Sequence, residues 1–483
     1  MKIIILGAGR VGESVADSLV SERNDITVID TDARRLRDLE SRFDLRGVVG
    51  NGIEPAVLAE AGARDTDLLI ACAALDETNL VCCKVAQRLF SIPTRIARVR
   101  SAGFQDDALM GPEGLAVDRI ICPEESLTRY IGKLIEYPEA MQVRQFAGGR
   151  ACLVAVRARA GAPLVSHAIG ELREILPDVD MRLVAIYRRF LDEPDRFVAC
   201  DGETRVEPGD EVFVLAASAH IAQVIAALHR RGEQAAHPVR RIMIAGGGRV
   251  GLRLAQQLAE VPGRFQVKII EDDPGRCIEL ASTLPSEVLV LQGDTTDEDL
   301  LTGESVDEID LFLALTDDDE DNIMSCLLAK RMGARRVLAL INRRSYADLM
   351  HGTQIDIALS PAQAMLGELL AYVRQGDVQA VHSLRRGVAE ALEIVARGDR
   401  KSSRVVGRKV ADLQLPHDVH MGLIVRGLPD KGDTPETLAR EPEVIIPHSA
   451  TVIESNDHVV FFLPHKRLVR DVEKLFRVSA TFF

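Results

Sequence analysis

Residues 2–30, KIIILGAGRVGESVADSLVSERNDITVID, decide the fold of this chain. An apolar run that ends at Leu6 leads into the glycine-rich turn GAGRVG at residues 7–12. A helical pattern of apolar residues follows, and a second apolar run ends on Asp30, eighteen residues beyond Gly12. Strand, glycine-rich turn, helix, strand and terminal acid is the order that a dinucleotide-binding βαβ unit requires. The stretch therefore predicts such a unit at the start of the chain.

The residues of the turn have separate physical roles in this interpretation. Gly7 permits the tight turn, Gly9 lets the backbone approach a pyrophosphate, and Gly12 lets the helix pack closely on the strand. Backbone N–H groups at the start of the helix face the phosphates. Asp30 accepts hydrogen bonds from ribose hydroxyls and repels a 2′-phosphate. The predicted binding residues of the loop are Gly7, Ala8, Gly9, Arg10, Val11 and Gly12.

An arginine inside such a loop has two interpretations. The guanidinium of Arg10 stands at the start of a phosphate-binding helix, where it can pair with a diphosphate or a terminal phosphate. Alternatively, Arg10 is a solvated surface residue, because exposed ion pairs contribute little. Both interpretations remain open on the sequence alone.

Composition excludes several classes of protein. The chain has 483 residues, too many for one core, and a formal net charge of −14, which argues against a nucleic-acid-binding surface. No apolar run is long enough for a transmembrane helix, and Met1-Lys2 leads directly into the first strand, which leaves no room for a signal peptide. The eight cysteines lack CxxC spacing and the eleven histidines lack metal-ligand spacing, so buried free thiols are favoured over a metal or redox site at Cys82-Cys83. We predict no metal site and no catalytic residue.

An internal repeat is the strongest global pattern of the sequence. GGGRVG at residues 246–251 repeats GAGRVG at 7–12, and the apolar run after it ends on Glu271. DEDN at 319–322 likewise repeats DETN at 76–79, with the same order of strand and helix patterns between. Small shifts of spacing fall in expected loops. The pattern indicates a duplicated lobe.

Each copy alternates strand and helix patterns. In the first copy the expected strands are residues 2–6, 26–30, 46–49, 67–72, 95–99 and 119–121. The expected helices between them are residues 10–21, 33–42, 54–61 and 77–90, and a further helix covers 126–137. Such alternation predicts an α/β fold with a parallel sheet, whose strands all end at one edge, where ligands bind.

A second kind of segment follows each lobe. From about Met141 the strands become shorter and are separated by turns, with strands expected at 153–156, 184–187 and 211–215. Val206 to Asp210 forms a turn before the last of these strands, and Ile453 to Asp457 repeats that turn in the second half. We therefore expect two small α+β lobes, and residues 230–238 form a polar linker between the halves.

Further polar residues fall at strand ends of the first lobe. Asp76 and Asn79 can reach the far ribose or the nicotinamide, or they can cap the following helix. Arg98 and Arg100 alternate along one strand and either contact an anion or pair with Asp76 or Glu77. The binding residues predicted beyond the loop are Asp30, Asn51, Gly52, Ala73, Asp76, Asn79, Arg98 and Arg100.

The second lobe departs from the first. Leu340 and Asn342 align near Arg98 and Arg100, so cations have been lost, although Arg343 and Arg344 lie close by. The lobe binds a different nucleotide, binds more weakly or serves as structure; these alternatives stay open. Its predicted binding residues are Gly246, Gly248, Arg249, Val250, Gly251, Glu271 and Asp294.

The ordered motifs resemble one known family. GAGRVG at 7–12, Asp30, GNG at 50–52, DETN at 76–79, ARVR at 97–100, PGDEVFVL at 208–215 and GGGRVG at 246–251 are similar to motifs of the TrkA family. Its members are peripheral nucleotide-binding subunits of bacterial Trk potassium-uptake systems and carry tandem RCK (regulator of potassium conductance) domains. One departure is Asn51, where the family often carries Asp.

The resemblance implies the domain organisation of the whole chain. The fold class is α/β, with two Rossmann-like parallel-sheet lobes, each followed by a small α+β RCK-C (TrkA-C) lobe. The first RCK-N lobe covers residues 1–138 and the first RCK-C lobe covers 139–228. The second RCK-N lobe covers 238–362 and the second RCK-C lobe covers 378–467.

The resemblance also implies a function. The chain would bind NAD(H), with ATP or ADP as further candidates, assemble into a homo-oligomeric ring and gate K⁺ flux through a Trk-type membrane subunit of the TrkH/TrkG kind. It would be cytoplasmic and peripheral on the inner face of the membrane through that partner. By the same implication, Arg10 and Arg98 contact ligand phosphates and Asp30 contacts the adenosine ribose.

Two other functions are weighed against this one. An NAD-dependent oxidoreductase needs a proton donor near the nicotinamide, but none of the five tyrosines is in a YxxxK pattern and no histidine lies near the strand ends of the first lobe. A nucleotide-sensing scaffold for another membrane partner is the third candidate. A regulatory subunit without enzymatic activity is favoured.

Overall fold

The computed structural model divides into two compact units. It describes residues 1–20, 24–104, 107–190, 195–198, 200–229, 237–343, 346, 354–374, 377–385, 388–429 and 441–478. Unit 1 combines Met1–Arg129 with Arg240–Leu369, and unit 2 combines Tyr130–Val239 with Leu370–Phe483. Each unit therefore takes one piece from each half of the chain. No helix in the described ranges is long and apolar enough to cross a membrane.

The first lobe of unit 1 is built on a six-stranded parallel sheet in the order β3-β2-β1-β4-β5-β6. The strand order reverses beside β1, which is where ligands of such sheets bind. The strands are β1 (Lys2–Leu6), β2 (Asp25–Asp30), β3 (Arg46–Val49), β4 (Leu68–Ala71), β5 (Thr94–Arg98) and β6 (Arg119–Ile121). The helices are α1 (Arg10–Val20), α2 (Ala33–Arg42), α3 (Pro55–Glu60), α4 (Asp76–Phe90), α5 (Asp107–Met110) and α6 (Pro123–Glu136).

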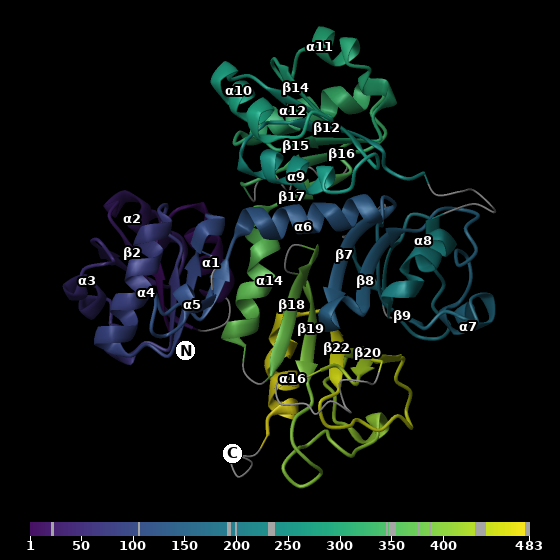
Figure 1. Cartoon of the computed structure of the whole chain (residues 1–483). Coiled ribbons are helices and arrows are strands. Elements are labelled where there is room, and N and C mark those ends of the chain that lie inside the picture. The colour runs from purple at the N-terminus through teal and green to yellow at the C-terminus, as the bar shows by residue number, and fades with distance from the viewer. Residues whose placement is uncertain are drawn as a thin grey trace. The chain divides into compact units, whose positions relative to one another are not determined.

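Burial explains why these segments form strands and helices. All four residues of β4 are fully buried, as expected for a strand that helices cover on both faces. Helix α1 buries Val15, Ala16 and Leu19 on one side, and it packs on β1 and β2. Helix α4 packs on β4 and β5 in the same way. Figure 1 shows these helices flanking the strands of the lobe.

The second lobe of unit 1 repeats this topology, in the order β14-β13-β12-β15-β16-β17, which confirms the predicted duplication. Its strands are β12 (Arg241–Ala245), β13 (Gln266–Glu271), β14 (Val288–Gln292), β15 (Leu311–Ala314), β16 (Val337–Leu340) and β17 (Ile357–Leu359). Its helices are α9 (Arg249–Ala259), α10 (Pro274–Thr283), α11 (Glu298–Gly303), α12 (Asp319–Arg331) and α14 (Pro361–Val373).

Unit 2 contains two five-stranded antiparallel sheets of one topology. Their orders are β7-β8-β11-β9-β10 and β18-β19-β22-β20-β21, strand for strand the same. The first sheet has β7 (Ala140–Phe146), β8 (Ala151–Arg157), β9 (Met181–Arg188), β10 (Arg196–Val198) and β11 (Glu211–Ala217), with helices α7 (Leu172–Ile175) and α8 (Ile221–His229). The second has β18 (Val378–Leu384), β19 (Ala389–Val395), β20 (His420–Arg426), β21 (Glu443–Ile445) and β22 (His458–Leu463), with helix α16 (Val469–Phe476).

The turn before the last strand of each small lobe is held by an arginine. Arg188, at the end of β9, donates two hydrogen bonds to the carboxylate of Asp210, at 2.9 and 2.8 Å. Arg426, at the end of β20, donates two to Asp457, both at 2.8 Å. Both aspartates are almost fully buried. We call the two hydrogen bonds from one arginine to one aspartate the arginine clamp, and each small lobe has one. The two turns that are similar in sequence, 206–210 and 453–457, are therefore also similar in structure.

The two small lobes share one hydrophobic core. Phe213 and Leu215 of the first sheet pack in the same cluster as Val460 and Phe462 of the second. A Cβ at Gly422, on β20, would lie 2.1 Å from the Leu215 side chain, so β20 approaches the first lobe as closely as a glycine allows. The two lobes, separate along the chain, therefore form one folded body.

The structure differs from the sequence expectation in the grouping of the lobes and in two strands. The sequence predicts the chain order of the lobes, but the structure groups them by type into two units. Strands β7 and β10 were not predicted. Residues 230–236 of the expected linker at 230–238, and Arg344, lie outside the described residues, so the expectations for them stay expectations.

Candidate nucleotide cradle

The glycine loop of the first lobe connects the end of β1 to the start of α1. Gly7 has a φ of +101°, and a Cβ there would lie 2.9 Å from the Ala73 backbone nitrogen. A Cβ at Gly12 would lie 1.8 Å from the Gly7 carbonyl oxygen, so only glycine fits between helix and loop. A Cβ at Gly9 would meet nothing within 4 Å. Gly7 and Gly12 therefore serve the fold, whereas Gly9 borders open space where a ligand backbone contact is feasible.

The acid at the end of β2 holds this loop. One carboxylate oxygen of Asp30 accepts a hydrogen bond from the Ala8 N–H at 2.6 Å, and the other accepts one from the Asp32 N–H at 2.8 Å. The side chain stays partly exposed at the carboxyl edge of the sheet. Asp30 is therefore both a brace for the loop and an available acceptor for a ribose.

Arg10 is the first residue of α1 and is exposed beside the open space at Gly9. Within the described ranges, its guanidinium has no hydrogen bond or ion pair. Val11 is partly buried in the first turn of the same helix. Helix N-termini attract anions through their free N–H groups, so a cation at this position adds to an existing anion preference.

The loop after β3 lines the same edge of the sheet. The Asn51 side-chain oxygen accepts a hydrogen bond from the Ile53 N–H at 3.3 Å. Gly52 is buried, and a Cβ there would lie 2.5 Å from the Leu6 side chain. Gly52 is thus required for packing against β1, and Asn51 forms a local turn.

Asn79 makes backbone contacts that the sequence did not predict. Its buried amide accepts a hydrogen bond from the Ala73 N–H at 2.8 Å, and it donates to the Ala73 oxygen at 3.1 Å and the Arg98 oxygen at 2.9 Å. The side chain therefore ties the end of β4 to the end of β5. It does not cap α4, whose N-cap residue, Leu75, has no side-chain oxygen.

Asp76 and Arg100 are paired, which is one of the predicted alternatives. The Asp76 carboxylate accepts hydrogen bonds from the Arg100 and Ser101 N–H groups, both at 2.9 Å, and from the Arg100 guanidinium at 3.2 Å. Burial by itself would raise the pKa of Asp76, but these N–H groups of Ser101 and Arg100 more than offset it, so the pKa is lowered. The pair fixes the loop after β5.

Arg98 pairs with an acid that sequence reasoning missed. Its guanidinium donates to Glu124, in the first turn of α6, at 2.8 Å, and both side chains are largely buried. The Arg98 Nε has no hydrogen-bond partner within the described ranges. Burial raises the pKa of the nearby Cys72 to about 12, an effect that the charge of Arg98 opposes and that of Asp30 increases. Arg98 therefore lies at the cradle, but it is held by Glu124 rather than by Asp76 or Glu77.

The second cradle reproduces the frame of the first. Gly246 has a φ of +103°, a Cβ at Gly251 would lie 2.1 Å from the Gly246 oxygen, and Gly248 faces open space. Glu271 accepts a hydrogen bond from the Gly247 N–H at 2.7 Å, as Asp30 does from Ala8. Arg249 is exposed and Val250 partly buried, like Arg10 and Val11.

The strand ends of the second cradle match those of the first as well. The Asn322 amide donates to the oxygens of Thr316 and Leu340, and Asp319 accepts from the N–H of Asn342. The alignment of Leu340 with Arg98, and of Asn342 with Arg100, is therefore correct. Asp294 begins a turn after β14, where it accepts from Thr296 at 2.7 Å.

Arg276 of the second lobe was not predicted. Its Nε donates to the Gly247 oxygen at 2.8 Å, and its terminal nitrogen pairs with Glu279 at 2.6 Å. Neither the contact between Arg276 and Gly247 nor the one between Arg98 and Glu124 is visible in the sequence, because each joins residues from different elements with no spacing rule between them. A search for unpaired acids near the strand ends could have found Glu124.

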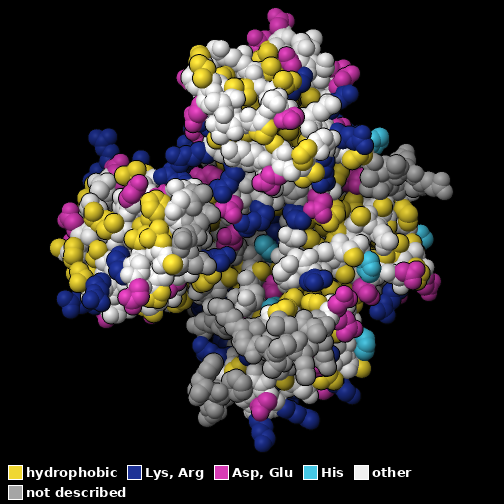
Figure 2. All heavy atoms as spheres, viewed as in Figure 1, with side chains coloured by type: hydrophobic (Ala, Val, Ile, Leu, Met, Phe, Trp, Pro, Cys, Tyr) yellow, Lys and Arg dark blue, Asp and Glu magenta, His cyan; other side chains and the backbone are white. Residues whose placement is uncertain are grey.

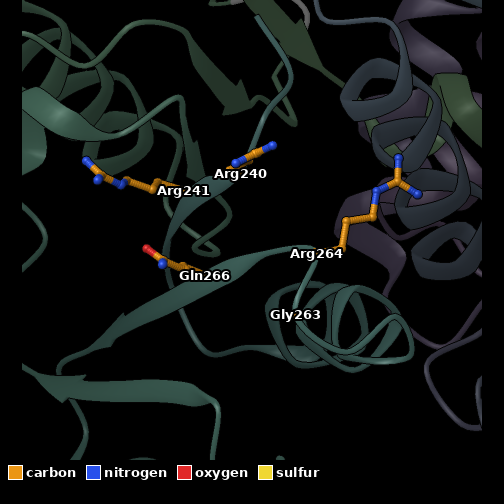
Figure 3. Close-up of a pocket in the computed structure, with 5 residues that line it drawn as sticks. All are labelled: Arg240, Arg241, Gly263, Arg264 and Gln266. Atoms are coloured by element: carbon orange, nitrogen blue, oxygen red, sulfur yellow. The ribbon is translucent and has the colours of Figure 1, made fainter.

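A cavity of about 420 Å³ lies away from both cradles. It is lined by Arg240, Arg241, Gly263, Arg264 and Gln266, at the amino-terminal ends of β12 and β13. Figure 3 shows that the Arg241 and Arg264 side chains extend in opposite directions rather than toward one point. Arg241 pairs with Glu308 at 2.5 Å. No predicted site residue lines this cavity.

Surface charge and possible metal ligands indicate no further site besides the two cradles in the part of the chain that the structure describes. Figure 2 shows acidic and basic side chains intermixed over the visible face, without a broad basic area. Among the described residues, no group of three or more His, Cys, Asp or Glu is arranged to hold a metal ion. The described cysteines are free, and most are buried.

Solved structures show the same fold. The GsuK RCK domain aligns over 98% of this chain and 94% of its own, with a TM-score of 0.57 and 16% identity. A structure described as "GsuK channel bound to NAD" aligns over 98% of this chain and 78% of its own, with a TM-score of 0.58 and 16% identity. Fold and cradles thus define a protein with two Rossmann-like lobes and two small antiparallel lobes, a fold that it shares with these structures.

Sequence comparisons identify the family. The TrkA-N domain model matches residues 3–123 and 242–361, and the TrkA-C domain model matches residues 153–229. Proteins named Trk system potassium uptake protein TrkA are 48% identical in Halomonas elongata and 47% identical in Vibrio alginolyticus, each over 100% of both chains. The protein of that name in Haemophilus influenzae is 42% identical over the same span. The chain belongs to the TrkA family of Trk system potassium uptake proteins.

Proposed function

We propose that this chain is a regulatory subunit that binds NAD(H), ATP or ADP in its first cradle and gates K⁺ uptake through a Trk-type membrane subunit. The observation that carries the proposal is the glycine loop itself. Within this loop, Gly9 borders open space; it follows Ala8, whose N–H binds the partly exposed Asp30, and it precedes the exposed Arg10. The chain also matches TrkA relatives from end to end. A homo-oligomeric ring on the inner face of the membrane, with a TrkH/TrkG-like partner, completes the proposal.

Residue roles follow from the geometry of the first cradle. The N–H groups at Gly9 to Val11 would bind the pyrophosphate, Arg10 a phosphate, and Asp30 the adenosine ribose. Arg98 would reach a phosphate by exchanging Glu124 for it. Ala73, Asp76, Asn79 and Arg100 would act as the frame that holds the strand ends in position.

The domain boundaries are also part of this proposal. The divisions at residues 138, 228, 238, 362, 378 and 467 separate the lobes by type. Nucleotide occupancy of the RCK-N lobes would be transmitted as a population shift, limited by the difference in nucleotide affinity between the two conformations.

The relatives and one neighbour support the choice of ligand and process. The curated relatives carry the name Trk system potassium uptake protein, and the GsuK channel is described as bound to NAD. An oxidoreductase would instead consume NADH, so NADH turnover with a small carbonyl substrate would contradict the proposal. Co-purification with a membrane protein unrelated to K⁺ transport would favour a scaffold.

The variant Arg10→Ala tests the proposal. Losing one charge-assisted phosphate contact should weaken nucleotide binding about tenfold to a hundredfold in calorimetric titration. K⁺ uptake by cells that carry the variant as their sole copy should lose its dependence on that nucleotide. Arg37→Ala, an exposed arginine of α2, is the matched control and should leave both unchanged. Equal affinity of Arg10→Ala and the unmodified chain would refute the assigned role.

A further inference from the structure

The two cradles differ in charge far more than in shape. The segments compared are residues 7–10, 30–32, 50–52, 73–78 and 98–101 of the first lobe, and 246–249, 271–273, 293–295, 316–321 and 340–343 of the second. The first set contains three cationic and four acidic side chains. The second contains two cationic and nine acidic side chains. The backbone frame is shared, so the difference lies in the side chains.

The acids of the second cradle come from three strand ends and act on one another. Asp272 follows β13, Asp294 follows β14, and Asp318 and Asp321 follow β15. The pKa of Asp321 is raised, first by burial and then by the charges of Asp318, Asp294, Glu320 and Asp272. The carboxylates therefore share one region at the carboxyl edge of the sheet.

The cations near this edge are largely engaged. Arg276 donates to the Gly247 oxygen and pairs with Glu279. Arg343 pairs with Glu320 at 2.8 Å. Arg249 is the counterpart of Arg10, but Leu340 and Asn342 replace the two arginines of the first cradle. Of the two cations in the compared segments, Arg343 is therefore paired with an acid, and Arg249 has no ion pair among the described residues.

We infer that the two cradles differ in their affinity for anionic nucleotides. The first cradle binds a nucleotide that carries no metal ion, whereas the carboxylates of Asp294, Asp318 and Asp321 repel its phosphates from the second. The inference rests on the proposed function, because it presupposes nucleotide binding by the first cradle. A pyrophosphate at the start of α9 would lie near several carboxylates at the same edge of the sheet, and these like charges would repel it. The free N–H groups at the start of α9 attract a phosphate, but those at the start of α1 do so equally. They therefore do not explain a difference between the two cradles.

Titration of the intact chain with NADH in the presence of EDTA tests this inference. We expect one nucleotide per chain. The variant Asp294→Asn/Asp318→Asn/Asp321→Thr should bind a second. Asn keeps the acceptor oxygens that hold the turn at Thr296 and cap α12, and Thr is the first-lobe residue at the position of Asp321. An unchanged melting temperature verifies folding.

The reverse exchange, Asn51→Asp/Leu75→Asp/Thr78→Asp, places the acids in the first cradle. It should lower NADH affinity by at least about tenfold. The control Glu260→Gln/Glu287→Gln/Asp307→Asn removes the same charge from exposed positions of the second lobe, at the opposite edge of its sheet, and should still bind one nucleotide.

The outcomes separate this inference from the proposed function. Two nucleotides per unmodified chain would overturn the inference and leave the function standing. One nucleotide per well-folded Asp294→Asn/Asp318→Asn/Asp321→Thr chain would overturn it as well. No binding by the unmodified chain would overturn the proposed function and the inference together.

Discussion

Gly9 and Gly12 stand three residues apart in one loop, yet their substitution by alanine should affect the stability of the fold differently. In Gly12→Ala the new Cβ would lie 1.8 Å from the Gly7 oxygen, so α1 must shift. We expect a loss of about 3 kcal/mol of unfolding free energy and a loss of nucleotide binding with it. In Gly9→Ala the Cβ enters open space, so stability should be unchanged while the added methyl weakens nucleotide binding.

Urea denaturation and calorimetric titration of both variants check this pair. Gly303→Ala, at another position with nothing within 4 Å of a Cβ, is the control and should alter neither quantity by more than a few tenths of a kcal/mol. A Gly9→Ala chain that binds NADH normally would contradict the assignment of Gly9 to the ligand-facing side of the loop.

For single residues, the sequence predicts where a side chain lies better than it predicts which contacts that side chain makes. The spacing of the glycines and of Asp30 specifies the loop, because each role depends on local backbone geometry. Asn79 lies at the expected strand end, but it satisfies the backbone groups of Ala73 and Arg98. A buried backbone group needs a partner, and which side chain supplies it depends on the packing of two strands, which no local pattern encodes.

At the scale of elements, the arginine clamp should stabilise both small lobes equally. Replacing the buried Asp457 by Asn removes a charge from a bidentate pair and leaves Arg426 partly desolvated. We expect a loss of about 3 kcal/mol, and the same loss for Asp210→Asn, because the contacts repeat. Hydrogen exchange of β22 and β11 measures each local loss.

The control variant is Glu454→Gln, which alters an exposed partner of Arg426 and should cost less than about 1 kcal/mol. A larger loss of stability in Glu454→Gln than in Asp457→Asn would contradict the argument.

The elements themselves were predictable where burial is uniform. Strands β1, β2 and β4 of the first RCK-N lobe contain continuous buried runs, since both faces of a parallel sheet are covered. Strand β7 escaped prediction because its register shifts between Ala140 and Gln142, so buried residues recur at every third position instead of every second. Strand β10 has only three residues, too few for a period to be recognised.

At the scale of the whole molecule, the pairing of the small lobes could not be derived from the sequence. An apolar sheet face must be covered, but the pattern of β11 does not state what covers it. The cover is the second small lobe, which begins only at Val378 and packs on the first through the shared core and an ion pair between Glu211 and Arg385 at 2.6 Å. Duplication supplies both halves of this body within one chain.

The buried Glu211 makes unit 2 sensitive to pH in a direction that can be worked out. Burial raises its pKa above the ordinary 4.5, although Arg385, Arg157 and Arg189 oppose the rise. The folded state therefore holds a proton that the unfolded state releases. The contribution of this group to stability is greatest below pH 4.5 and is lost as pH rises through the elevated pKa. Glu211→Gln carries no such proton. Its melting temperature relative to the unmodified chain should therefore rise between pH 4.5 and the elevated pKa of Glu211 and then level off.

Glu207→Gln, which alters an exposed neighbour, is the control. If the difference in melting temperature between Glu211→Gln and the unmodified chain stays constant from pH 4.5 to pH 8, the Glu211 carboxyl titrates alike in the folded and unfolded states, and the prediction is wrong.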